Sequence, residues 1–439
     1  MTTLTLLNKP ETGPAQAVAT LRHALPGAVH VPGDEPYERQ RPAYRGAPAI
    51  VVEAQSPADI QTAVRVAREH ELPLTVQSTG HGTLVAPDGG VLLRTSAMAQ
   101  VLVDPDRQVA YVGPGARWSE VIAAAEPFGL APLSGDTPSV GVVGYTLGGG
   151  LSWLSRKYGF AADSLLRAEL VTADGRLVTA DQHHNPDLFW ALRGGSGNFG
   201  VITALEFQLY RVPQVYGGTA VFGIERAADA LSFLEHHGDL LPDELSLSMV
   251  VTRHTVELDG PGLILRVVYA GTRAGAQAAL EPLYHAAGSP AVERLRTMRY
   301  SEVASIGGTA PRGFAMFERL SPALVGQLVD AVHDPDSGVN AVEVKHWGGA
   351  IARPAHPAPG PVSHREVPYV MKLDASPQAI DGLTAEATGG SFLNFLHDTT
   401  RTHTAYTPDN HRRLREIKAT YDPDNVFHRN HNIVPAGRS

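Results

Sequence analysis

In the stretch Gly141-Val142-Val143-Gly144-Tyr145-Thr146-Leu147-Gly148-Gly149-Gly150, five of ten residues are glycine. Glycine at this density indicates a backbone that adopts conformations closed to other residues, or that must approach another group closely. Successive exposed N–H groups in such a loop can hold a phosphate or carbonyl oxygen without help from Lys or Arg. The stretch therefore predicts an anion-binding loop, with a merely flexible loop as the alternative.

A second loop of small residues, Gln77 to Thr83, directly follows an apolar strand expected over residues 72–77. Its backbone is again rich in free donors, and two such loops together suit a diphosphate. His81 lies between Gly80 and Gly82, at the mouth of this expected site. Its imidazole could act as a base or as a point of covalent attachment; an ordinary surface histidine is the alternative.

The elements around these loops indicate an α/β or α+β protein. Residues 48–54 and 91–95 are apolar strands, and Ser56-Pro57-Ala58-Asp59 has the pattern of a helix start. The segment Gly195 to Gly200 matches the dinucleotide pattern G-x-G-x-x-G. That pattern needs a strand before it and a helix after it. Here a helix (186–193) precedes and a strand (201–209) follows, so a Rossmann site is not expected.

Composition limits the classes of function. A chain of 439 residues with 43% hydrophobic and 18% charged residues predicts two globular lobes. The net charge of −9 and the lack of a long basic run argue against nucleic acid and anionic membranes as partners. Residues 1–10 lack a basic leader, and no run of about 18 apolar residues occurs, so a cytoplasmic protein is expected. With no Cys and no H-E-x-x-H pattern, and with His428-x-x-His431 as the only histidine set at plausible ligand spacing, no metal site is predicted.

The two glycine loops belong to a longer series of motifs that runs from about residue 43 to the end. The series comprises Val76–Gly82, Asp88–Gly90, Pro138–Gly150, Leu154–Gly159, Val171–Gly175, Asn185–Gly195, Gly348–Ala350, His364-Arg365 and Tyr421–Phe427. In this order the motifs resemble the berberine-bridge-enzyme-like branch of the vanillyl-alcohol oxidase and p-cresol methylhydroxylase flavoproteins. The resemblance implies a two-lobed α+β fold with an antiparallel-sheet substrate domain. It implies an FAD-binding domain over 1–212, a substrate-binding domain over 213–395, and a C-terminal segment, 396–439, that returns to the first.

The resemblance also implies how FAD is held. His81 matches the histidine that family members bond to the flavin. Val201 and Ile202 match the backbone that pairs with adenine, and Asn430 and Asn432 match polar residues close to the flavin. The full expected FAD-binding set is Gln77, Ser78, Thr79, Gly80, His81, Gly82, Thr83, Gly135, Asp136, Thr137, Gly141, Gly144, Tyr145, Gly148, Gly149, Gly150, Gly200, Val201, Ile202, Asn430 and Asn432.

Three departures from the family pattern change what is expected. Thr137 stands where bicovalent members have Cys, so at most one covalent link, at His81, is possible. Gln77-Ser78-Thr79 replaces the more usual Arg-Gly-Gly, which leaves open whether His81 is bonded to FAD or only adjacent. Phe392 stands where the family commonly has a tyrosine that acts as a base.

Because Phe392 cannot accept a proton, another group must do so if a protein base is needed. Four residues beside the motifs are candidates: Tyr145, Tyr369, Lys372 and Tyr406. For each, core packing or a solvated position is the alternative.

These observations predict an FAD-dependent oxidase. It would take a hydride from a small alcohol, sugar or specialised metabolite and pass the electrons to O₂, giving H₂O₂. The first alternative is a flavin-containing cyclase or rearrangement catalyst without net redox turnover, which the missing tyrosine favours. The second is a non-catalytic flavin-binding protein.

Overall fold

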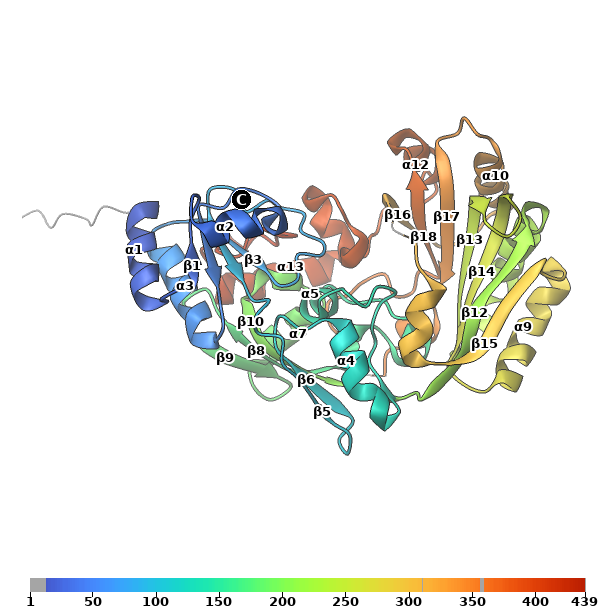
Figure 1. Ribbon diagram of the computed structural model, residues 1–439. Coiled ribbons are helices and arrows are strands. Elements are labelled where there is room, and N and C mark those ends of the chain that lie inside the picture. Colours follow the sequence, from blue (N-terminus) through green and yellow to red (C-terminus); the bar gives the residue numbers. More distant parts are fainter. Residues whose placement is uncertain (1–12, 310, 356–358, 439) are drawn as a thin grey trace, which may run out of the picture.

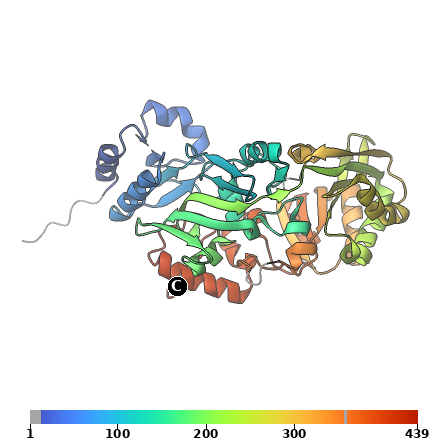
Figure 2. The same ribbon diagram turned by 90° about the horizontal axis from the view of Figure 1, so that it is seen from below.

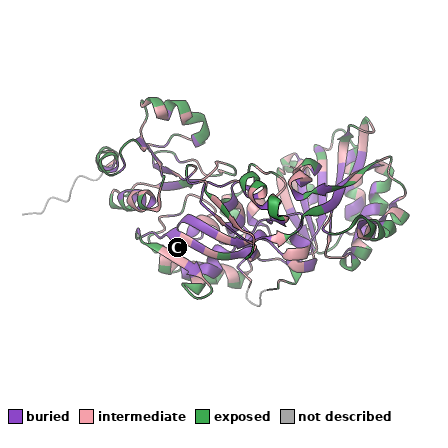
Figure 3. Ribbon diagram, turned by 60° about the horizontal axis from the view of Figure 1, so that its bottom comes forward, coloured by how far each residue is buried: buried purple, intermediate pink, exposed green. Residues whose placement is uncertain are grey.

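The computed structural model describes residues 13–309, 311–355 and 359–438. Residues 1–10, on which the prediction of no leader rests, lie outside these ranges. The described chain forms two lobes that lie side by side (Figures 1 and 2). The strands of both lobes are largely buried, and most exposed surface belongs to helices and connections (Figure 3).

The first lobe begins with a four-stranded sheet in the order β1-β2-β4-β3. Strands β2 and β3 run parallel to β4, and β1 is antiparallel to β2. The bounds are β1 (Val29–His30), β2 (Ile50–Glu53), β3 (Leu74–Gln77) and β4 (Val91–Arg94), with helices α1 (Pro14–Ala24), α2 (Glu35–Gln40) and α3 (Pro57–Glu69). The strands and the helix start predicted for this region are confirmed.

Helix α3 shows why the chain folds locally as it does. The Ser56 hydroxyl accepts a hydrogen bond from the Asp59 backbone N–H, and the Asp59 carboxylate accepts one from Ser56 N–H, so both form a capping box. Pro57 is the first helical residue, a position at which its missing N–H costs nothing. Buried Ile60, Val64 and Ala67 then follow at helical spacing and pack on the sheet.

A five-stranded antiparallel sheet completes the first lobe, in the order β5-β6-β10-β8-β9. Its strands are β5 (Val101–Asp104), β6 (Val109–Val112), β8 (Leu165–Val171), β9 (Leu177–Asp181) and β10 (Val201–Gln208), and its helices include α4 (Trp118–Ala125), α5 (Val142–Leu147), α6 (Ser155–Tyr158) and α7 (Pro186–Leu192). A short pair, β7 (Leu130–Ala131) and β11 (Tyr210–Arg211), lies beside it. Helix α7 precedes the glycines at 195–200 and β10 follows them, as predicted.

The second lobe is a seven-stranded antiparallel sheet in the order β15-β12-β14-β13-β17-β18-β16. Its strands are β12 (Gln214–Gly223), β13 (Leu245–Thr255), β14 (Gly260–Tyr269), β15 (Val292–Arg299), β16 (Gly313–Phe317), β17 (Val339–His346) and β18 (Tyr369–Ala375). Its helices are α8 (Ala227–His237), α9 (Arg273–Ala287), α10 (Pro322–His333), α11 (Gly349–Ala352) and α12 (Pro377–Leu383). Helix α9 lies on the side of the sheet away from the first lobe (Figure 1).

The two faces of this sheet differ because side chains alternate along a strand. Met249, Leu265, Val344 and Met371 point into the apolar core under α8, α9 and α10. Their neighbours on the opposite face include Glu343 and Lys345 of β17 and Lys372 of β18, which are buried although they are charged, and the half-buried Arg266 of β14. The second lobe thus presents a polar sheet face toward the first lobe.

After the second sheet the chain returns to the first lobe. Leu393 belongs to the first lobe's apolar core, as do Leu414 and Ile417 of α13 (Pro408–Tyr421), which packs against α7. The red helix α13 lies within the first lobe in Figure 1. Of the helices in the described ranges, none is both long enough and apolar enough to cross a bilayer.

Candidate functional site

The two glycine-rich loops meet in space. Ser78 and Thr79, directly after β3, lie against Gly141, so that a Cβ atom on Gly141 would stand 2.9 Å from Thr79 Cγ2. The Ser78 hydroxyl donates a 2.5 Å hydrogen bond to Pro114 O, which ties the first loop to the segment before α4. Small residues are therefore needed on both sides of this contact.

The start of the second loop is held by backbone bonds to the segment before α4. Val142 N–H donates to Ala116 O at 3.0 Å, and Trp118 N–H donates to Val140 O at 3.1 Å. An isolated antiparallel bridge pairs Arg117 with Gly141 between them. The loop is consequently an anchored structure and not a flexible tether.

The last three glycines of the loop contact the segment in which the chain returns to the first lobe. Asn394 Oδ1 accepts a 2.9 Å hydrogen bond from Gly150 N–H, and Asn394 Nδ2 donates to Tyr145 O at 3.1 Å. A Cβ on Gly148 would lie 2.7 Å from Asn394 Nδ2, and one on Gly149 would lie 2.8 Å from the Phe392 ring. Gly149 also has φ +118°, which disfavours other residues. Close approach of this segment thus requires glycine here.

Other parts of the same region face space that protein atoms do not fill. A Cβ on Gly82 or Gly144 would meet no described atom within 4 Å. The side-chain oxygens of Asn430 and Asn432 are buried and have no hydrogen-bond partner among the described residues. Because buried polar atoms are normally paired, these two atoms indicate a bound group that carries donors.

Val201 and Ile202 begin strand β10 nearby. They pair with β8 on one side, whereas the ladder with β6 covers only Leu205–Gln208. Their backbone on the β6 side is therefore available to a planar ring with a donor and an acceptor. The neighbouring Gly200 has a packing role, because a Cβ there would lie 2.7 Å from Val171 O.

At the junction of the two lobes lies a cluster of five charged side chains, which we call the junction cluster: Asp136, Arg266, Glu343, Lys345 and Lys372. Both lysine Nζ atoms lie 3.7 Å from Asp136 Oδ2. They lie 3.5 Å (Lys345) and 3.7 Å (Lys372) from the Glu343 carboxylate, and Arg266 Nη1 is 3.6 Å from it. Asp136 comes from the glycine-rich region, so the cluster connects that region to the polar sheet face.

The cluster is bordered by aromatic rings and hydrogen-bond donors. Lys345 Nζ lies 4.3 Å from the centroid of the Trp153 ring, and Lys372 Nζ lies 4.6 Å from that of Phe395. Glu343 accepts a 2.5 Å hydrogen bond from the Ser248 hydroxyl. Burial raises the pKa of Glu343, but Lys345, Lys372, this hydrogen bond and Arg266 outweigh it, and the pKa is well below its usual range. Glu343 is thus a fixed negative charge.

Comparison with known proteins agrees with this geometry. The protein family described as "FAD binding domain" matches residues 48–181, and the one described as "Berberine and berberine like" matches residues 391–434. These ranges cover both glycine loops and the segment that contacts Gly148–Gly150. In both of these regions the chain is similar to the berberine-bridge-enzyme-like FAD-linked oxidoreductases.

Individual relatives are similar over nearly the whole chain. An FAD-linked oxidoreductase of Dictyostelium discoideum is 27% identical over 96% of this chain and 98% of its own length. (R)-6-hydroxynicotine oxidase of Paenarthrobacter nicotinovorans is 28% identical over 94% of this chain and 98% of its own. The crystal structure of 6-hydroxy-D-nicotine oxidase from Arthrobacter nicotinovorans matches with a TM-score of 0.79 and 25% identity, over 92% of this chain and 97% of that one.

The described residues of this FAD-linked oxidoreductase fit FAD. The unpaired side-chain oxygens of Asn430 and Asn432, the open faces of Gly82 and Gly144, and the backbone edge at Val201 that β6 does not cover offer acceptors, donors and space for such a cofactor. Of the predicted binding set, Gln77 stands apart, because its side chain is buried and donates to Ala43 O at 3.2 Å. His81 is exposed, between two glycines that both have positive φ.

The four candidate bases of the oxidoreductase lie in different places. Tyr369 is on the helix side of β18, and its hydroxyl donates to Leu234 O and Glu235 O at 3.3 Å. Tyr406 is in the first lobe's core and donates to Gly194 O at 3.0 Å. The structure therefore places these two tyrosines in core packing, away from the junction cluster. Tyr369 lies in the core because side chains alternate between the two faces of a strand. It is three residues from Lys372, so the two side chains point to opposite faces.

Tyr145 and Lys372 are the candidates near the junction. The Tyr145 hydroxyl is buried without a hydrogen-bond partner in the described part of the chain. Burial, with Tyr300 and Asp136 nearby, raises its pKa well above the usual value, so the phenol stays protonated. Lys372 belongs to the junction cluster itself. Burial and the neighbouring Lys345 lower the pKa of its ammonium group, although Glu343 and Asp136 oppose this shift.

Phe392 is buried in an aromatic group at the same junction. Its ring lies 5.2 Å from that of Phe160, 5.5 Å from Trp347 and 5.6 Å from Phe395, measured between centroids. The Lys372 ammonium group in turn lies over the face of the Phe395 ring. Lys372 thus lies one ring away from the position where the family commonly has tyrosine.

Sequence reasoning missed Arg266, Glu343 and Lys345. A signal existed in Val342-Glu343-Val344-Lys345, where apolar and charged residues alternate as in a strand with one core face. Such a charged face is usually solvated, and nothing local shows that this one is covered by another lobe. Asp136, predicted only as a cofactor-binding residue, also contacts the two lysines.

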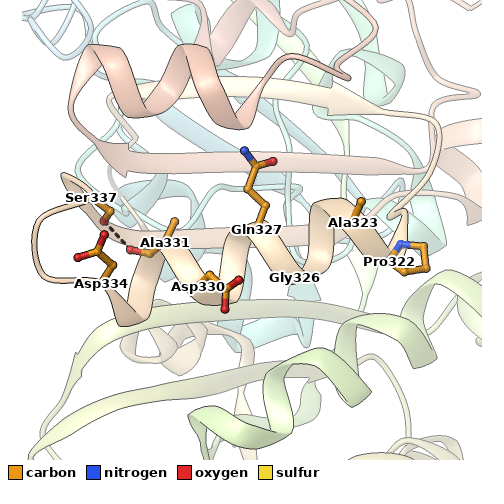
Figure 4. A pocket seen from close by; sticks show the side chains of 8 residues that line it. All are labelled: Pro322, Ala323, Gly326, Gln327, Asp330, Ala331, Asp334 and Ser337. Carbon is orange, nitrogen blue, oxygen red and sulfur yellow. Dashed lines mark hydrogen bonds between the residues drawn. The ribbon is translucent and has the colours of Figure 1, made fainter.

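A groove elsewhere on the surface carries no comparable chemistry. It has a volume of about 600 Å³ and runs along α10, lined by Pro322, Ala323, Gly326, Gln327, Asp330, Ala331, Asp334 and Ser337 (Figure 4). Its lining consists mainly of small residues on one helix and the turn after it. Within the described ranges, no group of three His, Asp or Glu side chains is placed to hold a metal ion.

Proposed function

We propose that this FAD-linked oxidoreductase is an oxidase of a small organic molecule. It removes a hydride from a carbon that bears oxygen or nitrogen, and the electrons pass to O₂. For an alcohol the balanced reaction is R₂CHOH + O₂ → R₂C=O + H₂O₂. The observation that carries this proposal is the junction cluster, which places titratable side chains of the substrate lobe directly beside the glycine-rich FAD site.

The first lobe would hold FAD mainly through backbone and small side chains. The loop from Ser78 to Thr83 and the glycines from Gly141 to Gly150 would contact the diphosphate and its flanking chain. Val201 and Ile202 would pair with adenine, and Asn430 and Asn432 would bond the polar edges of the cofactor. When bound, FAD supplies the hydride acceptor and the two-electron carrier of the reaction.

The second lobe would bind and orient the substrate. The polar face of β13, β14, β17 and β18 offers Ser248, Arg266, Glu343, Lys345 and Lys372. Apolar clusters around Trp153 and Tyr300 on one side, and around Phe160 and Trp347 on the other, exclude bulk water from the junction. In such surroundings charged groups interact more strongly than in water.

We also propose one covalent bond between FAD and His81. The histidine lies in a loop whose flanking glycines have positive φ, next to Thr79, which contacts Gly141. The chain has no Cys, and Thr137 stands at the position of the second link. After acid precipitation of the purified protein, yellow colour should remain in the pellet, and it should be lost from the pellet of the H81A variant. Flavin found only in the wild-type supernatant would exclude the bond.

The oxidase proposal is tested with a panel of alcohols, sugars, phenols and amines. A substrate should bleach the flavin absorbance without oxygen, and in air it should consume O₂ and release an equal amount of H₂O₂. Bleaching without H₂O₂ release in air would indicate a dehydrogenase instead.

Phe392 favours a second candidate, a cyclase or rearrangement catalyst that uses the pocket without net redox turnover. The ring at this position cannot take a proton, and its group of aromatic neighbours would suit an apolar substrate. This alternative predicts substrate conversion with the flavin still oxidised. Steady O₂ consumption with the converted substrate would exclude it.

A further inference from the structure

The chain is unusually selective in its use of lysine. It has 31 arginines and only five lysines, at positions 9, 157, 345, 372 and 418. Three of the five, Lys345, Lys372 and Lys418, are buried. Arginine keeps its proton at any physiological pH, whereas a buried lysine can release it. Two lysines in one buried cluster, in a chain that otherwise uses arginine, therefore indicate that at least one of them exchanges a proton.

The structure distinguishes the two lysines of the junction cluster. Burial lowers the pKa of Lys345, but Asp136 and Glu343 outweigh it and leave the pKa raised. For Lys372 the balance is opposite, because burial and Lys345 prevail over the two carboxylates. Lys345 thus holds its proton more strongly than Lys372, and Lys372 is also the lysine that lies over the Phe395 ring, next to Phe392.

The charges of the cluster add up in a way that fits this difference. With Lys372 neutral, Lys345 and Arg266 balance Glu343 and Asp136, and the net charge is zero. When Lys372 gains a proton, the cluster carries one positive charge. A buried excess charge is costly unless an opposite charge lies beside it. The protonated cluster is therefore matched to one negative charge on the substrate.

We propose that Lys372 is the catalytic proton acceptor for a hydroxyl group of the substrate, and that the pocket accepts hydroxylated substrates and rejects ammonium cations. This inference rests on the proposed oxidase function and gives it a base and a substrate class. The base lies on β18, one aromatic ring from Phe392, and so replaces the tyrosine that the chain lacks.

The proton transfer balances without any additional reactant. The substrate O–H bond breaks, and its proton forms a new N–H bond with the lone pair on Lys372 Nζ. The electron pair left on oxygen becomes the second bond of C=O as hydrogen leaves the carbon with its own electron pair, which bound FAD would accept. The resulting Lys372 ammonium stays beside Asp136 and Glu343, which stabilise it until the proton returns to solvent.

Two arginine variants separate a base from a simple cation. K372R keeps a positive charge but cannot accept a proton, and K345R replaces one permanent cation by another. In wild type, the rate of anaerobic flavin reduction should fall with decreasing pH below a pKa that is lower than 10.5. K372R should reduce the rate of anaerobic flavin reduction about 10²–10⁴-fold, and this rate should no longer fall with decreasing pH. K345R should retain the fall of the rate at low pH. Equal behaviour of the two variants would overturn the proposal.

A second measurement does not depend on turnover. The holoprotein is labelled with acetic anhydride over a pH series, and labelling of each lysine is followed by mass spectrometry of its peptide. Lys372, whose pKa is lowered, should reach half-maximal labelling at lower pH than Lys345, whose pKa is raised. Labelling at the same or higher pH would overturn the proposal. So would no labelling at all, because the amine would then not be reachable from a pocket that admits substrate.

The substrate panel tests the selectivity. Hydroxylated compounds should reduce the flavin, and amines of similar size that are cationic at neutral pH should not. Reduction by amines alone would overturn the substrate class while leaving the oxidase function intact. If no compound reduces the flavin but labelling still gives Lys372 the lower pKa, the redox function fails and the assignment of a neutral lysine stands.

Discussion

Lys418 offers a stringent test of how the FAD site is supported. The side chain is fully buried at the end of α13, and its Nζ lies 2.5 Å from Asp422 Oδ2. It also donates to Asn198 O at 2.6 Å and to Phe427 O at 3.2 Å. One ammonium group therefore joins α13, the turn before β10, and the segment that leads to Asn430.

Replacing Lys418 by Met should destabilise the first lobe by about 3–5 kcal/mol, the usual cost of removing one partner of a buried ion pair. Methionine fills most of the space of the lysine stem, so the cost is electrostatic and not a cavity effect. Asp422 would keep its bonds from Val426 N–H and Phe427 N–H, but its charge would be uncompensated. A loss of this size is a large fraction of the 5–15 kcal/mol that stabilises a typical protein.

The assay is urea unfolding with free FAD present, followed by flavin fluorescence, which reports on the first lobe. K157M is the matched control, because Lys157 is partly exposed and its pair with Glu244 spans 3.5 Å. The control should lose at most about 1 kcal/mol. The double variant K418M/D422N should recover part of the loss because the unpaired charge is gone. Equal losses in K418M and K157M, or no recovery in the double variant, would refute the reasoning.

Three further variants test other contacts. G149V should lower FAD content and thermal stability, because Gly149 has φ +118° and a Cβ there would lie 2.8 Å from Phe392; retained FAD content would contradict this. F392Y should lower the free energy of unfolding by about 1–3 kcal/mol through overpacking against Gly149. Added to K372R, it should not restore the pH dependence of flavin reduction. Burial and Arg156 lower the pKa of His346 to about 4 from 6.5. Since the folded protein then binds fewer protons than the unfolded chain, stability should fall by about 3 kcal/mol from pH 6.5 to 4. H346N should flatten that dependence, as unfolding midpoints over this pH range would show.

Much of the fold could be predicted because its signals are local. The helix start at Ser56 and Asp59 and the density of glycine at 141–150 each reflect the conformation of a few neighbouring residues. The order of helix, glycine turn and strand around residue 197 excluded a Rossmann site for the same reason. These features depend little on distant parts of the chain.

The site was harder to predict because it depends on which surfaces meet. Asp136 and Lys345 are more than 200 residues apart in sequence, and no local pattern indicates that they lie 3.7 Å apart. The position of Tyr369 in the core has a different cause. Its position three residues before Lys372 in one strand already requires opposite faces, so strand alternation alone could have separated the two candidates. The buried position of Tyr406 could be predicted only from how the returning C-terminal segment packs on the first lobe.

The division of labour between the lobes explains how this chain can lack the tyrosine and still have a base. On the proposed function, the first lobe would hold FAD through glycines, backbone groups, two asparagines and His81. Charge and proton transfer would come from β14, β17 and β18 of the second lobe, whose polar face is separate from the apolar face that stabilises it. A side chain on that polar face can change without disturbing either core. Lys372 can therefore take the role that Phe392 cannot fill, while the glycine loops remain as the cofactor requires.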